Sequence, residues 1–327
     1  MSKRIAVGID IGGTLTKVGL VDLEGNLYGN LEFSTTDFPD FDDYLGELVG
    51  KIEYLESQLR GECEIVGIGI GAPNANYYRG TIEHAANLVW KDLIPFVEKL
   101  KRHRDLPIYM TNDANAAAIG EMVYGKARGM TDFMVITLGT GLGSGIVANG
   151  QLIYGHDAMA GELGHVLIEE GGRKCGTGRR GCLEAYVSST GIKRTVFYLL
   201  ADSLDESVLR NYSFRDLHGE VITKAADKGD EIAREAFRMT GEILGKQLAN
   251  FVAFSHPEAI FLLGGLAKSG KWIFEPTERY LDQYLLPYYK DKVKLLPSGM
   301  MDKNAAILGA AALVWDHLDE SFADHSG

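Results

Sequence analysis

Cysteine is scarce in this sequence, with three residues among 327. So small and odd a number of thiols does not make a disulfide framework, so a reducing compartment is expected. The chain also lacks any apolar run of 18 residues. Residues 1–4 pass straight into a strand pattern, without the apolar core and cleavage site of a signal peptide. We therefore expect a cytoplasmic protein that does not insert into a membrane.

Positive charge is also in deficit. The formal net charge of −12 argues against a surface for nucleic acid or for an anionic membrane, because both need basic patches. A small anion can still bind where backbone N–H groups gather. Hydrophobic residues make up 46% of the chain, which is typical of a globular protein, and 327 residues predict two lobes of unequal size.

A glycine-rich hairpin occurs twice. The sequence IAVGIDIGGTLTK of residues 5–17 returns as FMVITLGTGLGSG at residues 133–145, with Ile136 standing 127 residues after Ile9. Each copy is an apolar strand, a turn rich in glycine and a second apolar strand. Such turns leave backbone N–H groups bare, which suits phosphate oxygens. Two copies predict two lobes that hold one polyphosphate, although the first has Asp10 where the second has Thr137.

The spacing of apolar residues predicts mixed sheets with helices packed on them. A meander of three strands opens the chain, and alternating helices and strands follow it. After the first hairpin we expect a strand at 27–33, a helix at 41–60, a strand at 65–70, a helix at 91–103, a strand at 107–110, an alanine-rich helix from 114, a helix at 231–255, a strand at 259–263 and a closing helix at 304–313.

The first candidate site is Asp10 with the turn that follows it. A carboxylate at a strand end can hold Mg²⁺, while the N–H groups of Gly12, Gly13 and Thr14 hold phosphate. The alternative is a tight hairpin whose aspartate only satisfies turn amides. The second copy of the hairpin favours the functional interpretation. Lys17 either reaches a phosphate or is a solvated strand lysine.

The pair Asn112-Asp113 lies between a strand and an alanine-rich helix. A carboxylate at this helix N-terminus can accept a proton from an attacking hydroxyl. The alternative is that Asp113 is an ordinary N-cap, and the local sequence alone favours the cap.

A third candidate site is Gly264-Gly265, which follows a strand and makes a shelf for an adenosine group or an anion. This segment does not match the P-loop pattern, which removes that class of nucleotide binder.

Cys175 and Cys182 lie seven residues apart, and His165 lies ten residues before the first of them. These are three zinc-ligand types, whereas a closed zinc site needs four, so a metal site and a reduced loop both remain open. Cys63 is expected in core packing. Glu162 and Glu184 bracket the loop and are natural acceptors for sugar hydroxyls.

Taken together, these motifs resemble the ROK family of bacterial sugar kinases, within the actin/hexokinase-like superfamily. The resemblance covers nearly the whole chain. It rests on DIGGT at residues 10–14, NDANAAAIGE at 112–121, LGTG at 138–141, GELGH at 161–165 and GCLE at 181–184. It implies an α/β fold of two actin-like lobes (a duplicated ribonuclease H-like fold) with mixed sheets flanked by helices and a central cleft. The expected lobes are residues 1–113 with about 303–327, and residues 114–302.

The resemblance also implies a role for each matching residue. Asp113 matches the catalytic base, which acts on the terminal hydroxyl of the sugar. The sugar-binding positions are Asn87, Asn112, Asp113, Glu162, His165 and Glu184, the phosphate segments are Asp10 to Thr14 with Lys17 and Gly139-Thr140-Gly141, and the adenosine segment is Gly264-Gly265.

One departure from the family pattern concerns zinc. The family motif is Cys-x-Cys-Gly-x-x-Gly-Cys with an upstream histidine, and Thr177 stands where its middle cysteine belongs. A neutral hydroxyl is a poor zinc ligand. With His165, Cys175 and Cys182 as ligands, zinc either binds with a water in the fourth position, binds weakly, or is absent.

The resemblance implies an ATP- and Mg²⁺-dependent kinase that phosphorylates the 6-hydroxyl of a hexose, with glucose as the expected acceptor and a homodimer or higher homo-oligomer as the expected assembly. Fructose and N-acetylhexosamines are the alternative acceptors, and polyphosphate is an open alternative to ATP. A sugar-sensing regulator is the alternative from another class. The acidic charge, and the start of the sequence at the phosphate hairpin without a DNA-binding module before it, disfavour that alternative.

Overall fold

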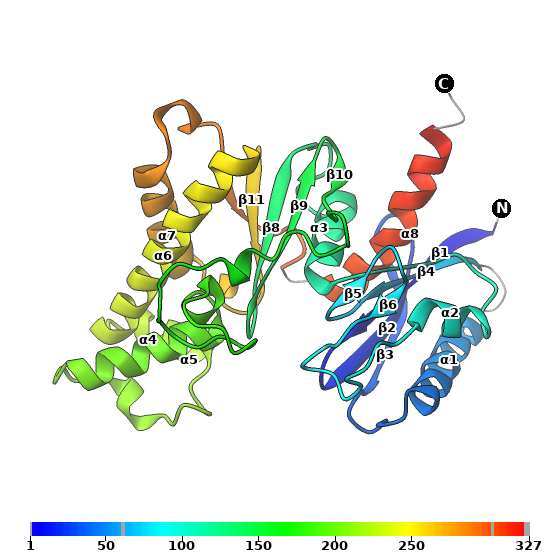
Figure 1. The fold of residues 1–327 in the computed structure, drawn as a ribbon, viewed down its shortest axis with the longest axis horizontal. Helices are drawn as coiled ribbons and strands as arrows, with labels where there is room; N and C mark the ends of the chain where they lie inside the picture. The colour runs from blue at the N-terminus through cyan, green and yellow to red at the C-terminus, as the bar shows by residue number, and fades with distance from the viewer. Residues whose placement is uncertain (1, 60–62, 302–303, 324–327) are drawn as a thin grey trace. The chain divides into compact units, whose positions relative to one another are not determined.

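The computed structural model describes residues 2–59, 63–301 and 304–323, and these form two compact units (Figure 1). Unit 1 contains the described residues up to Met130, the segment Leu152–Ala160 and the described residues after Met301. Unit 2 contains Thr131–Gln151 and Gly161–Met301. The division expected from the sequence placed the boundary at residue 113 and stays a prediction. Its closing part, 303–327, includes residues 303 and 324–327, which lie outside the described residues.

Unit 1 is built on a five-stranded mixed sheet in the order β3-β2-β1-β4-β7. The first three strands are antiparallel neighbours, and β1, β4 and β7 run parallel. The strands are β1 (Lys3–Ile11), β2 (Leu15–Val21), β3 (Leu27–Ser34), β4 (Cys63–Gly71) and β7 (Ile108–Thr111), with a small pair β5 (Ala75–Asn76) and β6 (Thr81–Ile82), and the helices are α1 (Phe41–Ser57), α2 (Phe96–Lys101), α3 (Asp113–Tyr124) and α8 (Ala305–Ala323).

Helices cover both faces of this sheet, because side chains alternate along each strand. Val7 and Ile9 of β1 face a core shared with α1, whereas Gly8 faces α8. A Cβ at Gly8 or at Gly69 would collide with backbone carbonyls of α8, so glycine lets the helix lie directly on the sheet. The helix α3 packs on α8 and therefore belongs to unit 1.

Unit 2 repeats the strand order with its own sheet, β10-β9-β8-β11-β12. Again an antiparallel hairpin leads, and β8, β11 and β12 run parallel. The elements are β8 (Phe133–Leu138), β9 (Leu142–Ala148), β10 (Gln151–Leu152), β11 (Ala259–Leu263) and β12 (Lys294–Pro297), the helices α4 (Ser189–Asp202), α5 (Gly219–Asp227), α6 (Glu231–Ser255) and α7 (Lys271–Tyr284), and the short 3₁₀ turns η1 (Leu163–His165), η2 (Leu183–Ala185), η3 (Val208–Asn211), η4 (Ala267–Ser269) and η5 (Pro287–Tyr289).

Most predicted elements are present, and one prediction is wrong. The helix expected at 91–103 is only α2, Phe96–Lys101. Ile94 instead exchanges two backbone hydrogen bonds with Ile82, which draws residues before Pro95 into an extended bridge. The helix expected at 41–60 ends at Ser57, and its residue 60 lies outside the described part of the chain. None of the described helices combines the length and the apolar character needed to cross a membrane.

Candidate active site

In unit 1, three parallel strands end in register. Asp10 of β1 pairs with Gly71 of β4, and Gly71 pairs with Thr111 of β7. Neighbouring strands lie about 4.8 Å apart, so Asp10 and the residues that follow Thr111 meet at one edge of the sheet. Gly71 also lies beside the backbone of Asp113. The sheet thus brings together two carboxylates that are about a hundred residues apart in the sequence.

Asn112, and not Asp113, caps the helix α3. The Asn112 side chain accepts a hydrogen bond from the Asn115 N–H at 2.7 Å, and Asp113 is the first helical residue. The prediction from local sequence that Asp113 is the N-cap is therefore wrong. With the cap supplied by its neighbour, Asp113 accepts the 2.9 Å bond from the Ala114 N–H and is not needed to close the helix.

Both carboxylates hold a proton more strongly than an ordinary aspartate. Burial, followed by the negative charge of Asp113, raises the pKa of Asp10 to about 6, and Lys17 opposes this effect. Loss of water around Asp113 raises the pKa of its carboxyl group as well. Hydrogen bonds from the backbone N–H groups of Ala114 and of Asp113 itself lower this pKa and offset part of the rise. A carboxylate with a raised pKa is a better proton acceptor, which is the property that a general base needs.

The turn after Asp10 lies against another predicted site residue. A Cβ at Gly13 would collide with the backbone carbonyl of Asn87, so the turn and the loop that carries Asn87 are in close contact. The turn is closed by a 2.9 Å bond from Gly12 N to Leu15 O, and Thr14 at its tip is exposed. Lys17 pairs with Asp10 across the hairpin. Asp10, Gly12 to Thr14, Lys17, Asn87, Asn112 and Asp113 thus all belong to unit 1.

In unit 2, the second glycine turn meets the N-terminus of α4 and the segment Gly264-Gly265. The carbonyl of Gly139 accepts a 2.8 Å bond from Ser189 N, in the first turn of α4. Leu266 N donates to Leu138 O at 3.1 Å, and Gly264, with a φ of +105°, leaves no room for a Cβ against Leu138. The residues predicted for phosphate and for adenosine therefore form one surface, and a Cβ at Gly139 would stand in open space there.

The Glu184 carboxylate closes the other side of this turn. Its two oxygens accept hydrogen bonds from Leu142 N at 3.3 Å and from Gly176 N at 3.2 Å. The carboxylate lies so close to Gly141 that any Cβ there would displace it. Glu184 thereby joins the turn Gly139–Gly141 to the loop between Cys175 and Cys182.

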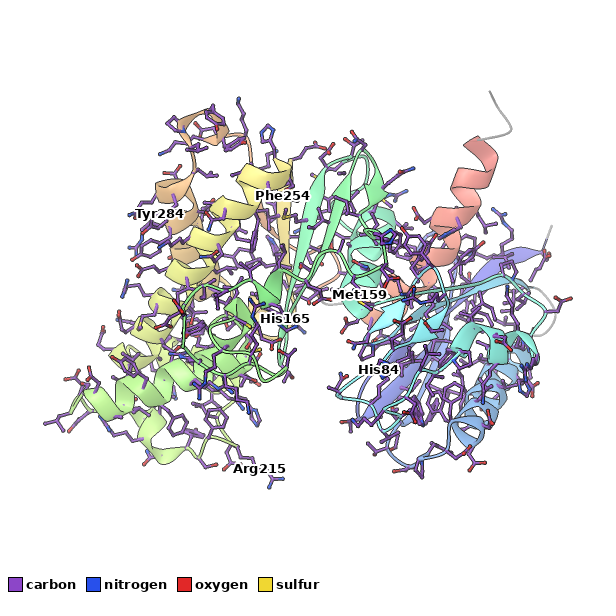
Figure 2. All side chains as sticks on the ribbon, viewed as in Figure 1. His84, Met159, His165, Arg215, Phe254 and Tyr284 are labelled. Carbon is purple, nitrogen blue, oxygen red and sulfur yellow. The ribbon has the colours of Figure 1, made fainter. Side chains whose placement is uncertain are left out.

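His165 and the two cysteines converge in the same unit. One ligand atom from each of His165, Cys175 and Cys182 lies within 4.8 Å of the other two. His165 Nδ1 is buried, and no hydrogen-bond partner for it is found in the described part of the structure. Figure 2 labels His165 on the loop that precedes α4. Two thiols and an imidazole that keeps one ring nitrogen unsatisfied make a donor set that fits zinc.

Thr177 occupies the position of a fourth ligand only in sequence. Its hydroxyl lies 3.1 Å from Cys175 Sγ, so it hydrogen-bonds to the thiol. The Glu162 carboxylate lies 3.8 Å from His165 Nε2. His165 can therefore face the thiols with one nitrogen and a ligand beside Glu162 with the other.

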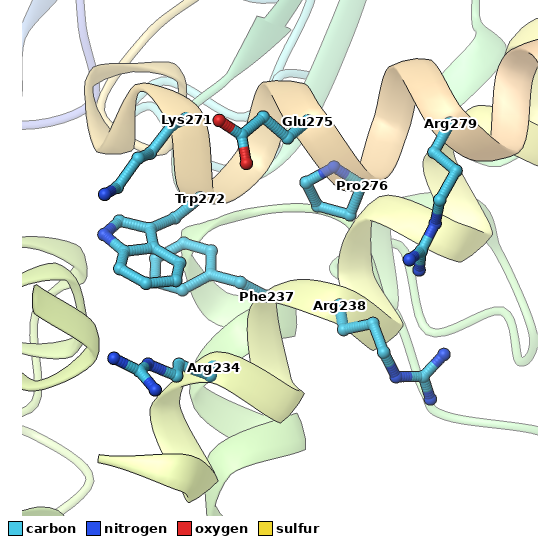
Figure 3. Close-up of a pocket in the computed structure, with 8 residues that line it drawn as sticks. All are labelled: Arg234, Phe237, Arg238, Lys271, Trp272, Glu275, Pro276 and Arg279. Atoms are coloured by element: carbon cyan, nitrogen blue, oxygen red, sulfur yellow. The ribbon is translucent and has the colours of Figure 1, made fainter. Parts of the chain in front are cut away.

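A cavity of about 320 Å³ between α6 and α7 does not belong to this site (Figure 3). Four basic side chains, two aromatic rings, Glu275 and Pro276 of those two helices line it, and none of the predicted site residues is among them. Arg238 is neutralised by Glu235 and Glu242, and Arg234 by Glu231. Two of the four cationic side chains of the cavity are thus already paired with carboxylates.

Sequence reasoning missed Ser144, Ser188 and Ser189. Ser144 Oγ donates to the carbonyl of Gly161 and accepts from Leu163 N, which fixes the segment that carries Glu162. Ser188 is the N-cap of α4. The run Ser188-Ser189 before an apolar helical pattern is a capping signal that could have found the second feature, whereas nothing in the sequence indicates the first.

The ROK family pattern matches residues 6–317 of the chain. The chain belongs to the ROK family.

A glucokinase of Halalkalibacterium halodurans is 34% identical over 326 residues, covering 96% of either chain. A crystal structure of a ROK family glucokinase from Streptomyces griseus, in complex with glucose and AMPPNP, has a TM-score of 0.79 at 29% identity and covers 94% of this chain and 98% of that one. A xylose repressor of Bacillus subtilis is 27% identical over 316 residues, which cover 95% of this chain and 77% of the repressor. The predicted family and the predicted α/β, actin-like fold class are confirmed.

Proposed function

We propose that this chain is an ATP-dependent hexose kinase that phosphorylates the 6-hydroxyl, with glucose as its preferred acceptor. The observation that carries the proposal is Asp113, a carboxylate of raised pKa that is released from capping and stands beside Asp10. Membership of the ROK family and the glucokinases among its relatives support the same reaction.

In the proposed reaction, Asn87, Asn112, Glu162, His165 and Glu184 bind the sugar hydroxyls. Asp113 accepts the proton of the 6-hydroxyl as its oxygen attacks the γ-phosphorus of ATP. The new bond is between sugar oxygen and phosphorus, the bond to the β,γ-bridging oxygen breaks, and ADP leaves. The proton ends on the Asp113 carboxylate.

The glycine turns are assigned to the phosphates of ATP, and Gly264-Gly265 with the N-terminus of α4 to its adenosine. Asp10 fits a divalent cation for two reasons. Burial and the charge of Asp113 disfavour its ionised form, so a bound cation would be stabilising. Its carboxylate also accepts no hydrogen bond from the described residues. A Mg²⁺ ion held by Asp10 would neutralise charge on the transferring phosphoryl group. Lys17, across the hairpin from Asp10, adds a second positive charge.

We also infer a zinc site with three protein ligands, His165 through Nδ1, Cys175 and Cys182. The buried, unsatisfied Nδ1 supports this inference. Bound zinc would fix the orientation of the imidazole ring and leave Nε2 for the sugar. The variant Thr177→Cys is expected to raise the zinc content per chain, measured by elemental analysis. No gain of metal in that variant would contradict a zinc site in this loop.

A homodimer or higher homo-oligomer in the cytoplasm is expected from the family resemblance and stays a prediction. Its test is the molar mass of the purified protein in solution. A monomer at micromolar concentration would contradict it.

The acceptor is tested by a coupled assay of ADP release with glucose, fructose, mannose, N-acetylglucosamine and N-acetylmannosamine. We expect the highest kcat/KM with glucose. A higher value with fructose or an N-acetylhexosamine would replace glucose as the acceptor. Because a repressor is also among the relatives, binding of a sugar without ADP release from any of them would favour a sugar-sensing protein instead.

A further inference from the structure

Three hydroxyl groups form a buried cluster directly behind the first phosphate turn. Thr16 Oγ1 lies 3.0 Å from Tyr44 Oη and 2.9 Å from Thr35 Oγ1, and all three residues are fully buried. They come from β2, from α1 and from the residue after β3. The cluster therefore joins three elements of unit 1 at one point.

The surroundings of this cluster are otherwise apolar. The Tyr44 ring packs against Phe33, Phe41 and Trp90, with ring centroids 5.4, 5.9 and 4.5 Å away. Burying hydroxyls in such a core contributes little to stability even when they are hydrogen-bonded, and Phe with Val would fill the same space. Packing alone thus gives no reason for these three polar groups.

Their position relative to the turn gives a reason. Thr16 pairs with Ile11 at the mouth of the β1–β2 hairpin, where the strands open into Gly12-Gly13-Thr14. Thr35 N donates a 2.9 Å hydrogen bond to the carbonyl of Thr14. The cluster thus holds both the base and the tip of the turn. Tyr44 is also near Asp10, since the Asp10 charge adds to burial in raising the pKa of the Tyr44 phenol, against the Thr16 hydrogen bond.

We propose that Tyr44 is a positioning residue for the phosphates of ATP, acting through Thr16 and Thr35 on the turn Gly12-Gly13-Thr14. The phenol holds the Thr16 hydroxyl, Thr16 holds Thr35, and Thr35 fixes the backbone of Thr14. This inference rests on the proposed function, which assigns that turn to phosphate. It adds a residue of α1 that touches neither substrate.

The test compares Tyr44→Phe with Tyr54→Phe, the same chemical change at an exposed position of the same helix. Loss of one positioning hydrogen bond, at about 1 kcal/mol, predicts a rise of about fivefold in KM for MgATP in Tyr44→Phe. KM for glucose is expected to stay unchanged, the midpoint of thermal unfolding to fall by no more than about 4 °C, and Tyr54→Phe to match the wild type.

A second pair of variants keeps the test decisive if Tyr44→Phe does not fold. Thr16→Val, which removes the central hydroxyl, is expected to weaken binding of Mg-AMPPNP about fivefold by calorimetry, and Thr16→Ser to restore it. Unchanged nucleotide binding in Thr16→Val, or equal losses for nucleotide and glucose together with a lower unfolding midpoint, would overturn the positioning role. An inactive wild type would instead contradict the proposed function.

Discussion

The sheets of the two units have the same strand order, but the residues at the edge of each sheet differ in their chemistry. Each has a hairpin of matching length, three turn residues after Ile11 and three after Leu138, followed by two parallel strands in the same order. Where unit 1 has Asp10, unit 2 has Thr137, whose hydroxyl accepts a 3.2 Å bond from Gly143 N. The second position is thus satisfied within its own hairpin, whereas the first leaves a charge without such a partner.

The carboxylates around the two turns also differ in origin. In unit 1 they stand at the ends of parallel strands, as Asp10 and Asp113. In unit 2 the turn is approached by Glu184, from a loop inserted between β10 and α4, and that carboxylate is occupied by backbone N–H groups. The comparison teaches that the repeated scaffold fixes where the glycine turn lies in each unit, while single residues and inserted loops decide which chemical groups surround it.

The largest expected effect separates Asp113 from Glu184. Asp113→Asn removes the proton acceptor, so kcat is expected to fall about 10³-fold while glucose binding persists. Glu184→Gln, the matched change in unit 2, is expected to raise KM for glucose about tenfold and to change kcat little. Steady-state kinetics with calorimetric glucose titration measure both. Near-normal turnover in Asp113→Asn would remove Asp113 from the role of base.

The next largest effect is expected at Asp10, compared with Thr137 at the equivalent position of the second hairpin. Asp10→Asn is expected to lower kcat/KM for MgATP about 10²-fold, because the carboxylate proposed for the cation is lost. Thr137→Val, at the equivalent position, is expected to stay within about threefold of the wild type. Kinetics at several Mg²⁺ concentrations test this difference. Equal effects of the two changes would mean that Asp10 has no role beyond the hairpin.

The pH dependence of stability gives a third test. The pKa of Asp10 is about 6 in the folded protein, above its ordinary value, so the folded state disfavours the charged form. Stability is therefore lost as pH rises through 6, and Asp10→Asn avoids this loss. Urea unfolding is expected to find the variant more stable at pH 8 by up to about 3 kcal/mol, with the difference vanishing below about pH 4. If Asp10→Asn were less stable than the wild type at pH 8, the charged form of Asp10 would not be disfavoured in the folded protein.

The smallest expected effects distinguish the two glycines of the second turn, Gly141 and Gly139. Gly141→Ala displaces the Glu184 carboxylate and is expected to raise KM for glucose about tenfold, since a placed hydrogen-bond acceptor is lost. Gly139→Ala adds a methyl group in open space on the proposed nucleotide side and is expected to raise KM for MgATP instead. If both variants changed the same KM, Gly141 and Gly139 would not serve different substrates.

The sequence predicts those features of the fold that depend on neighbouring residues, and it fails for those that depend on contacts between distant segments. The two hairpins were predictable because their alternating apolar residues and glycines repeat at one offset. The helix at 91–103 was overestimated, because the bridge between Ile94 and Ile82 is a tertiary contact. The cap of α3 was misjudged because Asn and Asp are equally good caps, and only the backbone decides between Asn112 and Asp113.

The motifs name the residues of the candidate site, but they do not predict how those residues contact one another. The family motifs named Glu184 and Gly141, but the contact between them joins segments 43 residues apart and follows from the fold of the loop. The hydroxyl cluster of Thr16, Thr35 and Tyr44 has no motif, since each residue is ordinary within its own element. Such contacts depend on how strands and helices meet, which periodicity does not specify.

The central claim is that Asp113 directs one hydroxyl of a hexose to the γ-phosphate of ATP. The most direct measurement is ³¹P and ¹³C NMR of the product formed from glucose and MgATP by the wild type and by Asp113→Asn. The account predicts phosphate on carbon 6 with the wild type and almost no product with the variant. Phosphate on another carbon, or equal product from both proteins, would contradict it.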